Sequence, residues 1–304
     1  MSPRPPIRRV SPVGIPDKAM AAGNVAPRSG LKQRVLTAIV LVPVLLAGMF
    51  LLPTLAWALL MSVPATLGAS EWSRLAGYRR GGSVIFTVMV AATCLGFIGL
   101  GAVASSLSAK TAGVIVMLYL LALVFWSIAA PIWLFRGWRV TQPLILGAAG
   151  WIVLIPAWLA IVALQRTPAL LLAVLLAVWI ADIAAYFAGR RFGRRKLAPQ
   201  ISPGKTWEGV IGAFVAVLLY GLVASFLLLQ PAATAYDRAG MLVFFVAVTV
   251  LAIVGDLFES WIKRVAGAKD SGNLLPGHGG ILDRVDSLTS TLPFAALYFL
   301  PAPW

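Results

Sequence analysis

Long apolar runs alternate with short polar segments along most of the chain. Crossing about 30 Å of hydrocarbon takes roughly 17 to 25 apolar residues in a helix. Runs of about this length occur near residues 35–52, 54–70, 84–106, 112–135, 142–164, 168–188, 208–230, 239–261 and 288–303. The pattern therefore predicts an all-α polytopic membrane protein with about nine transmembrane helices.

The composition also favours a membrane protein over a water-soluble one. Of the 304 residues, 60% are hydrophobic and 12% are charged, which is about half the charge of an ordinary soluble domain. The single cysteine, Cys94, lies in an apolar run and has no partner within the chain. Intrachain disulfides and thiolate metal sites are therefore excluded.

Three parts of the chain follow from this pattern. Residues 1–33 are rich in Pro, Gly and Arg without apolar periodicity, which is typical of a disordered basic tail. The first apolar run is long enough to span, so we expect it to be retained rather than removed as a secretory signal. We expect residues 34–165 to form N-terminal transmembrane helices and residues 166–304 to form a C-terminal transmembrane catalytic region.

Basic residues are concentrated in alternate loops of the nine-helix arrangement. With a cytoplasmic N-terminus, 22 of the 25 Lys and Arg residues fall on the cytoplasmic side, and only Lys110, Arg166 and Arg238 fall opposite. Such a bias sets the orientation of membrane proteins, so we expect the C-terminus to face outward. We therefore expect the basic residues behind the net charge of +15 to orient the protein and to attract lipid head groups and phosphates rather than nucleic acid.

Acidic residues indicate where chemistry takes place. The first five apolar runs carry almost no ionisable groups, and we expect them to serve packing and lipid contact. Charges near membrane depth are costly and usually functional. Eight of the ten acidic residues lie beyond residue 180, and seven of these lie at predicted cytoplasmic helix ends or loops: Asp182, Glu208, Asp256, Glu259, Asp270, Asp283 and Asp286.

Three of these carboxylates can share one cation. Asp283 and Asp286 are spaced to lie on one helix face, and Asp256 ends the preceding apolar run. Hard oxygen ligands without cysteine favour Mg²⁺ shared with substrate phosphates. The alternative is that Asp283 and Arg284 merely cap or pair at a helix start.

The loop before Asp283 is suited to a polyphosphate. Its glycines allow backbone amides to approach an anion closely, and the single histidine can titrate or donate to phosphate. Alternatively, the glycines only form a turn. The residues concerned are Lys263, Arg264, Lys269, Gly277, His278, Gly279 and Gly280.

A second polar cluster, residues 182–209, lies one cytoplasmic loop earlier. Its cations between residues 190 and 196 also suit orientation and head-group attraction. The sequence S-P-G-K-T at 202–206 resembles the end of a P-loop, but Pro199 replaces the first glycine, so it is not a Walker A motif. Lys205, Thr206 and the free amides of the next helix can still stabilise an anion. Glu208 in that first turn is expected to be structural.

Three motifs in this half of the chain resemble the signature of the phosphatidate cytidylyltransferases, or CDP-diacylglycerol synthases. The longest is S-x-x-K-R-x-x-x-x-K-D-x-G-x-x-x-P-G-H-G-G-x-x-D-R-x-D from Ser260 to Asp286. The others are D-x-x-A-Y-x-x-G-R from Asp182 and L-A-P-x-I-S-P-G-K-T-x-E-G from Leu197. The resemblance is strong over residues 165–304 and only general in character before them.

The resemblance implies transfer of a cytidylyl group from CTP to phosphatidic acid, giving CDP-diacylglycerol and pyrophosphate. It also implies Mg²⁺ paired with a monovalent cation such as K⁺, a polar cavity open to the cytoplasm, a homodimer and a bacterial inner membrane. A phosphatidate oxygen is already an anionic nucleophile. The enzyme's tasks are therefore positioning and charge neutralisation at the α-phosphate.

The same resemblance gives each candidate residue a role. Asp256, Asp283 and Asp286 are the expected metal ligands, and with Lys205 and Lys263 they form the expected catalytic group. Asp182 and Asp270 are expected to support the metal site from outside or to hold a cation, and pairing with a neighbouring lysine is an equal alternative for Asp270. The expected substrate-binding residues are Ser202, Thr206, Ser260, Arg264, Lys269, His278, Gly279, Gly280 and Arg284.

Two other classes of protein fit the sequence less well. A transporter or lipid-binding protein would place carboxylates near the bilayer midplane with paired broken helices, whereas these carboxylates cluster at one interface. Another lipid-linked phosphotransferase of the alcohol class would need a D-G-x-x-A-R pattern, which the sequence lacks. An inactive relative or one with an altered substrate stays open.

Overall fold

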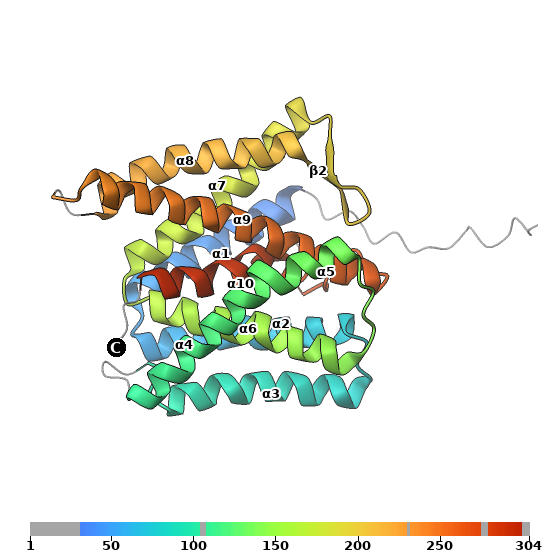
Figure 1. Cartoon of the computed structure of the whole chain (residues 1–304). Helices are drawn as coiled ribbons and strands as arrows, with labels where there is room; N and C mark the ends of the chain where they lie inside the picture. The colour runs from blue at the N-terminus through green and yellow to red at the C-terminus, as the bar shows by residue number, and fades with distance from the viewer. Residues whose placement is uncertain (1–30, 104–107, 230–231, 275–278, 300–304) are drawn as a thin grey trace, which may run out of the picture.

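The computed structural model describes residues 31–103, 108–229, 232–274 and 279–299, and side chains from residue 39 onward. Within them the chain forms nine helical rods (Figure 1). These are α1 (Leu31–Leu51), α2 (Thr54–Leu75), α3 (Arg80–Gly99), α4–η1–α5 (Ala109–Arg136), α6 (Pro143–Leu164), α7 (Pro168–Phe192), α8 (Trp207–Leu228), α9 (Ala235–Val265) and α10 (Leu282–Phe299). The predicted helix number is thus confirmed for the described part of the chain. Most of the predicted tail, residues 1–33, lies outside it.

Six of these rods are long and apolar enough to cross a membrane: α3, α4–α5, α6, α7, α8 and α9. The described apolar part of α1, Ile39–Leu51, is shorter than a span. α2 ends in a charged turn, and α10 begins with one. The chain is therefore a polytopic integral membrane protein, while crossing by α1, α2 and α10 stays a prediction.

A short β-hairpin interrupts the helical pattern between α7 and α8. Strand β1 (Lys196–Ala198) pairs antiparallel with β2 (Ser202–Thr206). The all-α prediction missed it because such short strands produce no recognisable periodicity. Glu208 fixes the base of the hairpin by accepting hydrogen bonds from the backbone N–H groups of Arg194 (3.0 Å) and Arg195 (3.2 Å). This contact agrees with the structural role expected for Glu208.

Helix α10 lies at the centre of the bundle, where it contacts α2, α4, α6, α7 and α9. Its close approach to α9 depends on Gly255, where a Cβ atom would lie 2.7 Å from the backbone oxygen of Asp286. The hydroxyl of Ser290 donates a hydrogen bond of 2.8 Å to the backbone oxygen of Leu251 across the same contact. Small residues permit such close helix packing in membranes, and here they bring Asp256 near α10.

Phe258 anchors α9 to the N-terminal helices. Its ring contacts those of Trp72, Phe125, Trp126 and Trp133, with centroid separations between 5.3 and 6.5 Å. Phe125 and Trp126 lie in the π-helical turn η1 (Phe125–Ala129) just before a proline, and π-turns of this kind often occur at functional sites. The aromatic contacts therefore join the C-terminal part of α9 to α2, η1 and α5.

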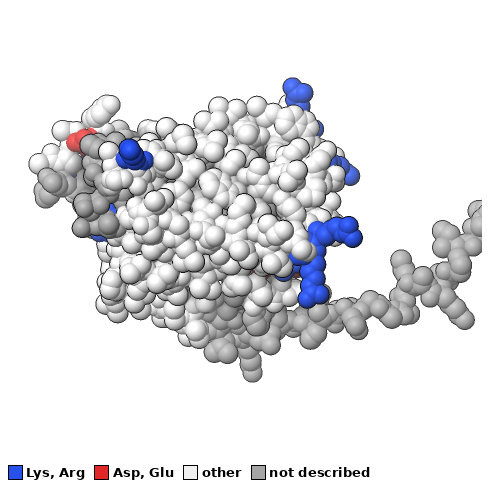
Figure 2. All heavy atoms as spheres, turned by 90° about the horizontal axis from the view of Figure 1, so that it is seen from below, with Lys and Arg blue, Asp and Glu red and all other residues white. Residues whose placement is uncertain are grey.

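The polar loops gather at opposite ends of the bundle because successive rods alternate in direction. The β-hairpin, the start of α8 and the end of α5 lie at the right-hand end of Figure 1. Figure 2 shows a lateral face that is almost entirely uncharged, with most of its visible Lys and Arg residues at the same end. This is the end for which the sequence predicts a cytoplasmic location.

Candidate functional site

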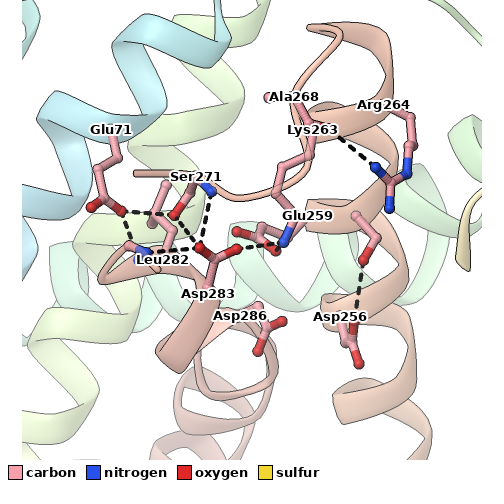
Figure 3. A network of polar contacts seen from close by, with 12 residues as sticks. Glu71, Asp256, Glu259, Lys263, Arg264, Ala268, Ser271, Leu282, Asp283 and Asp286 are labelled. Atoms are coloured by element: carbon pink, nitrogen blue, oxygen red, sulfur yellow. Dashed lines mark hydrogen bonds and ion pairs between the residues drawn. The ribbon is translucent and has the colours of Figure 1, made fainter. Parts of the chain in front are cut away.

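The C-terminal part of α9 directs a row of polar side chains toward the start of α10 (Figure 3). Asp256, Glu259, Ser260 and Lys263 are three or four residues apart, which places them on one helix face. Glu259 is 4% exposed and Lys263 is 8% exposed. Buried charges are stable only when they are paired, so their partners define the site.

Lys263 joins two carboxylates from different helices. Its ammonium nitrogen lies 2.5 Å from Oε2 of Glu259 and 2.6 Å from Oδ1 of Asp283. In the described part of the chain, Lys263 is the only polar contact of the Glu259 side chain. Sequence reasoning noted the position of Glu259 but gave it no role, although one helical turn separates it from a lysine.

Asp283 has hydrogen-bond partners on both carboxylate oxygens. While Oδ1 contacts Lys263, Oδ2 accepts hydrogen bonds from the backbone N–H of Ser271 (2.9 Å), the Ser271 hydroxyl (3.0 Å) and the backbone N–H of Gly280 (2.8 Å). The anion that the Gly280 amide approaches is thus Asp283 itself. Gly279 has a φ of +82°, a conformation that suits glycine.

Glu71 of α2 completes this buried group and was missed by sequence reasoning. It is fully buried and accepts hydrogen bonds from Ser271 Oγ (2.9 Å) and from the backbone N–H groups of Ile281 and Leu282 (both 3.0 Å). The available signal was a single carboxylate directly after the apolar run at 54–70. The sequence predicted packing and lipid contact for the first five runs, and the contacts of Glu71 give the end of α2 a polar role in addition. The buried network, as we call it, consists of Glu71, Glu259, Lys263, Ser271 and Asp283.

A second group is centred on Asp256, whose side chain is partly exposed to solvent, as is that of its partner Lys205. One carboxylate oxygen of Asp256 forms an ion pair with Lys205 of β2, and the other accepts a hydrogen bond of 3.3 Å from the Ser260 hydroxyl. Asp286 of α10 lies within electrostatic range of Asp256, Glu259 and Asp182. Its Oδ1 accepts a hydrogen bond of 2.7 Å from the backbone N–H of Ser287.

Asp182 and Arg284 complete the second group. Asp182, on α7, lies within electrostatic range of Asp256, Lys205 and Arg284. The residues of this group therefore come from four elements: α7, the strand β2, α9 and α10. The solvated cluster, as we call it, consists of Asp182, Lys205, Asp256, Asp286 and Arg284.

The carboxylates of the solvated cluster are ligands of the type that binds magnesium, but they are not arranged around a single ion position. No three acidic, His or Cys side chains among the described residues are placed to hold one ion. Asp256 and Asp286 offer hard oxygen atoms of the kind that Mg²⁺ prefers. Asp283 differs because Oδ1 already pairs with the ammonium group of Lys263 and Oδ2 already accepts hydrogen bonds from two backbone N–H groups. The expected cluster of all three aspartates is therefore not assembled here, because Asp283 belongs to the buried network.

The other candidates surround these two groups. Thr206 caps α8, where its hydroxyl accepts a hydrogen bond of 3.1 Å from the backbone N–H of Gly209. Arg264 reaches the hairpin and donates a hydrogen bond of 3.2 Å to the backbone oxygen of Ile201. Ser202 begins β2, and Lys269 and Asp270 are exposed in the loop after α9. Gly277 and His278 lie outside the described residues.

Comparisons with known proteins match nearly the whole chain to one family. The model of the cytidylyltransferase family matches residues 32–301. A phosphatidate cytidylyltransferase of Pseudomonas aeruginosa is 41% identical over 290 residues, covering 90% of this chain and 98% of the relative. One of Haemophilus influenzae is 36% identical over 287 residues, covering 88% and 98%. One of Bacillus subtilis is 45% identical over 125 residues, covering 41% and 44%.

An apolar helical bundle with one charged end, matched along its length by this family model, defines a membrane-bound nucleotidyltransferase. The relatives that align almost end to end narrow the class further. The chain belongs to the phosphatidate cytidylyltransferase family, as the resemblance of its motifs predicted.

Proposed function

We propose that the solvated cluster carries out the reaction of this family, in which the cytidylyl group of CTP is transferred to phosphatidate. The products are CDP-diacylglycerol and pyrophosphate. The observation that carries the proposal is that the three motifs of the C-terminal half, which are separate in sequence, contribute Asp182, Lys205 and Asp286 to one cluster around Asp256. The match to the family over residues 32–301 supports it.

Asp256 and Asp286 are the residues we propose to hold Mg²⁺, with Asp182 supporting them. When bound, the ion would supply Lewis-acid polarisation and a template for the triphosphate. Lys205 pairs with Asp256 in the described structure, so its ammonium would be released to a substrate phosphate when that carboxylate takes another cation. Asp283 would join the metal site only if Lys263 withdrew from it. A monovalent cation such as K⁺ beside the Mg²⁺ stays part of this proposal.

The remaining cations are proposed to neutralise phosphate charge. The attacking oxygen of phosphatidate is already an anion, so no residue has to remove a proton from it. Arg264, Lys269 and Arg284 are exposed at the same end of the bundle and can hold phosphates of CTP or phosphatidate. Ser202, Thr206 and Ser260 are proposed hydrogen-bond donors, and Gly279, Gly280 and His278 are proposed to line the nucleotide site.

The proposed setting is the bacterial inner membrane, with the charged end and the N-terminus in the cytoplasm. The skew of Lys and Arg toward one set of loops supports this orientation. With nine crossings the C-terminus would face outward. We further propose that the charged end opens as a polar cavity to the cytoplasm and to the lipid, and that two chains form a homodimer.

The test is release of pyrophosphate by the purified protein in detergent with CTP, phosphatidate and Mg²⁺. We expect release only when all three are present, with one CDP-diacylglycerol formed for each pyrophosphate, measured by mass spectrometry of the lipid extract. Replacing CTP by ATP, and phosphatidate by diacylglycerol, supplies the matched controls. A folded protein that releases no pyrophosphate under these conditions would contradict the proposal.

A further inference from the structure

Glu71 is an acidic residue in a helix that otherwise serves packing. It lies in the last part of α2, between the small residue Ser70 and the aromatic Trp72, and its side chain has no exposure to solvent. Its polar partners are about 200 residues further along the chain. A buried carboxylate costs several kcal/mol unless donors compensate it, so these partners explain why it is tolerated.

The partners of Glu71 are at the start of α10. The first N–H groups of a helix have no acceptor within the helix, and they carry the positive end of its dipole. Oε1 of Glu71 accepts from Ile281 and Oε2 accepts from Leu282, each at 3.0 Å. A carboxylate from α2 therefore fixes the N-terminus of the helix that carries Asp283 and Asp286.

Ser271 links Glu71 to Asp283. Its hydroxyl lies 2.9 Å from Oε2 of Glu71 and 3.0 Å from Oδ2 of Asp283, and a hydroxyl has one hydrogen to share between two acceptors. The link continues from Asp283 to Lys263. A displacement of the Glu71 carboxylate would therefore be transmitted to a proposed catalytic lysine.

Two glycines of the long C-terminal motif make room for Glu71. A Cβ atom at residue 272 would lie 2.5 Å from Oε1 of Glu71, and one at residue 280 would overlap both Oε2 of Glu71 and the Ser271 hydroxyl. Gly272 and Gly280 are thus required by a carboxylate of another helix. This is a different reason for glycine from the approach of a substrate phosphate.

We propose that Glu71 is a positioning residue for the cytidylyl transfer. It holds Ser271 and the start of α10 against α2 and thereby sets the orientation of Asp283 and Lys263. This inference rests on the proposed function, because its main readout is the rate of that reaction.

The test is a double-mutant cycle with Glu71→Gln and Ser271→Ala, in which kcat is measured as pyrophosphate release. A glutamine would keep the volume but present an N–H₂ group to one backbone N–H. We expect kcat to fall about 10- to 100-fold for Glu71→Gln and about fivefold or more for Ser271→Ala. The double variant should be no slower than about the slower single variant, since coupled residues are non-additive.

Asp237→Asn is the matched control. The carboxylate of Asp237 also accepts a hydrogen bond from a backbone N–H group, that of Thr234, at 2.8 Å. It lies at the opposite end of α9 from Glu259, about 30 Å away along a helix that rises 1.5 Å per residue. Its kcat should equal that of the wild type. This comparison separates a general loss of a capping carboxylate from a loss of positioning.

The outcomes are distinguishable from failure of the proposed function. If the wild type releases no pyrophosphate, the proposed function fails and the cycle is replaced by hydrogen exchange, which must show faster exchange at Ile281 and Leu282 in Glu71→Gln than in Asp237→Asn. With an active wild type, additive losses or a wild-type kcat in Ser271→Ala would overturn the positioning role. If Glu71→Gln does not fold, Ser271→Ala alone decides: a lower kcat with an unchanged Tm supports the role, and an unchanged kcat overturns it.

Discussion

The N-terminal helices α1–α6 and the C-terminal helices α7–α10 differ in how they contribute to the site. The C-terminal helices and the hairpin supply all the residues of the solvated cluster. The N-terminal helices supply one carboxylate, Glu71, and most of the aromatic rings around Phe258. The groups proposed to meet substrate thus come from one half, and the groups that hold them in place come from the other.

This difference explains why a motif search finds only half of the site. Residues that meet a charged substrate are themselves charged and occur close together in sequence. Residues that hold them act through packing and single hydrogen bonds, which resemble ordinary membrane-helix composition. Three substitutions, taken in order of their expected effect on turnover, test whether the halves divide the work in this way.

Asp286→Asn should have the largest effect on turnover. It removes a negative charge from the proposed metal site while keeping the side-chain volume, so we expect kcat to fall by about a thousandfold, since each 1.36 kcal/mol is a factor of ten. Membrane insertion and Tm should match those of the wild type. Near-normal turnover by the purified variant, measured beside Asp237→Asn, would remove Asp286 from the metal proposal.

Asp283→Asn should affect both turnover and stability. The substitution removes one of the two carboxylates that pair with buried Lys263 and changes an acceptor of two backbone N–H groups. We expect a fall in kcat of about 10- to 100-fold and a loss of about 1–3 kcal/mol in stability. Thermal unfolding in detergent measures the second effect. Unchanged stability together with lost activity would show that Asp283 acts on substrate or metal rather than through Lys263.

Phe258→Ala should affect stability alone among folded molecules. Removing a buried phenylalanine typically costs about 3–5 kcal/mol, and here four aromatic rings would lose their common neighbour. Below the lowered Tm, kcat per folded molecule should stay within about threefold of the wild type. Phe135→Ala is the matched control because Phe135 is 90% exposed. A large loss of kcat in a well-folded Phe258→Ala variant would show that these aromatic contacts also position the catalytic groups.

Hydropathy located the nine helices well but placed their charged ends less accurately. The apolar run predicted for α9 ends at residue 261, whereas the helix continues to Val265, and α10 begins at Leu282 rather than near residue 288. Lys263 and Asp283 are paired with each other, so the helices continue beyond the apolar runs. Hydropathy measures what the membrane accepts, and it cannot detect a helix that polar pairing extends.

The candidate site was predictable where the chemistry lies in motifs. Lys205, Asp256 and Asp286 were chosen from sequence, and the structure gathers them from three elements. Glu71 was not chosen because its partners are backbone N–H groups, which any sequence provides. The role of Asp283 in the buried network follows from a loop conformation that only tertiary structure specifies. The alternative weighed from sequence, that Asp283 pairs at a helix start, describes its contacts.

The length of α9 has a consequence for how the enzyme meets its lipid. Its 31 residues extend over about 46 Å, while the hydrocarbon is about 30 Å thick, so a helix centred in the bilayer would carry its last turn, with Lys263, to the depth of the lipid phosphates. A phosphatidate molecule can present its head group there while its acyl chains stay in the bilayer. The encounter is then a search in two dimensions, and its frequency is governed by the mole fraction of phosphatidate in the surface rather than by its amount per volume.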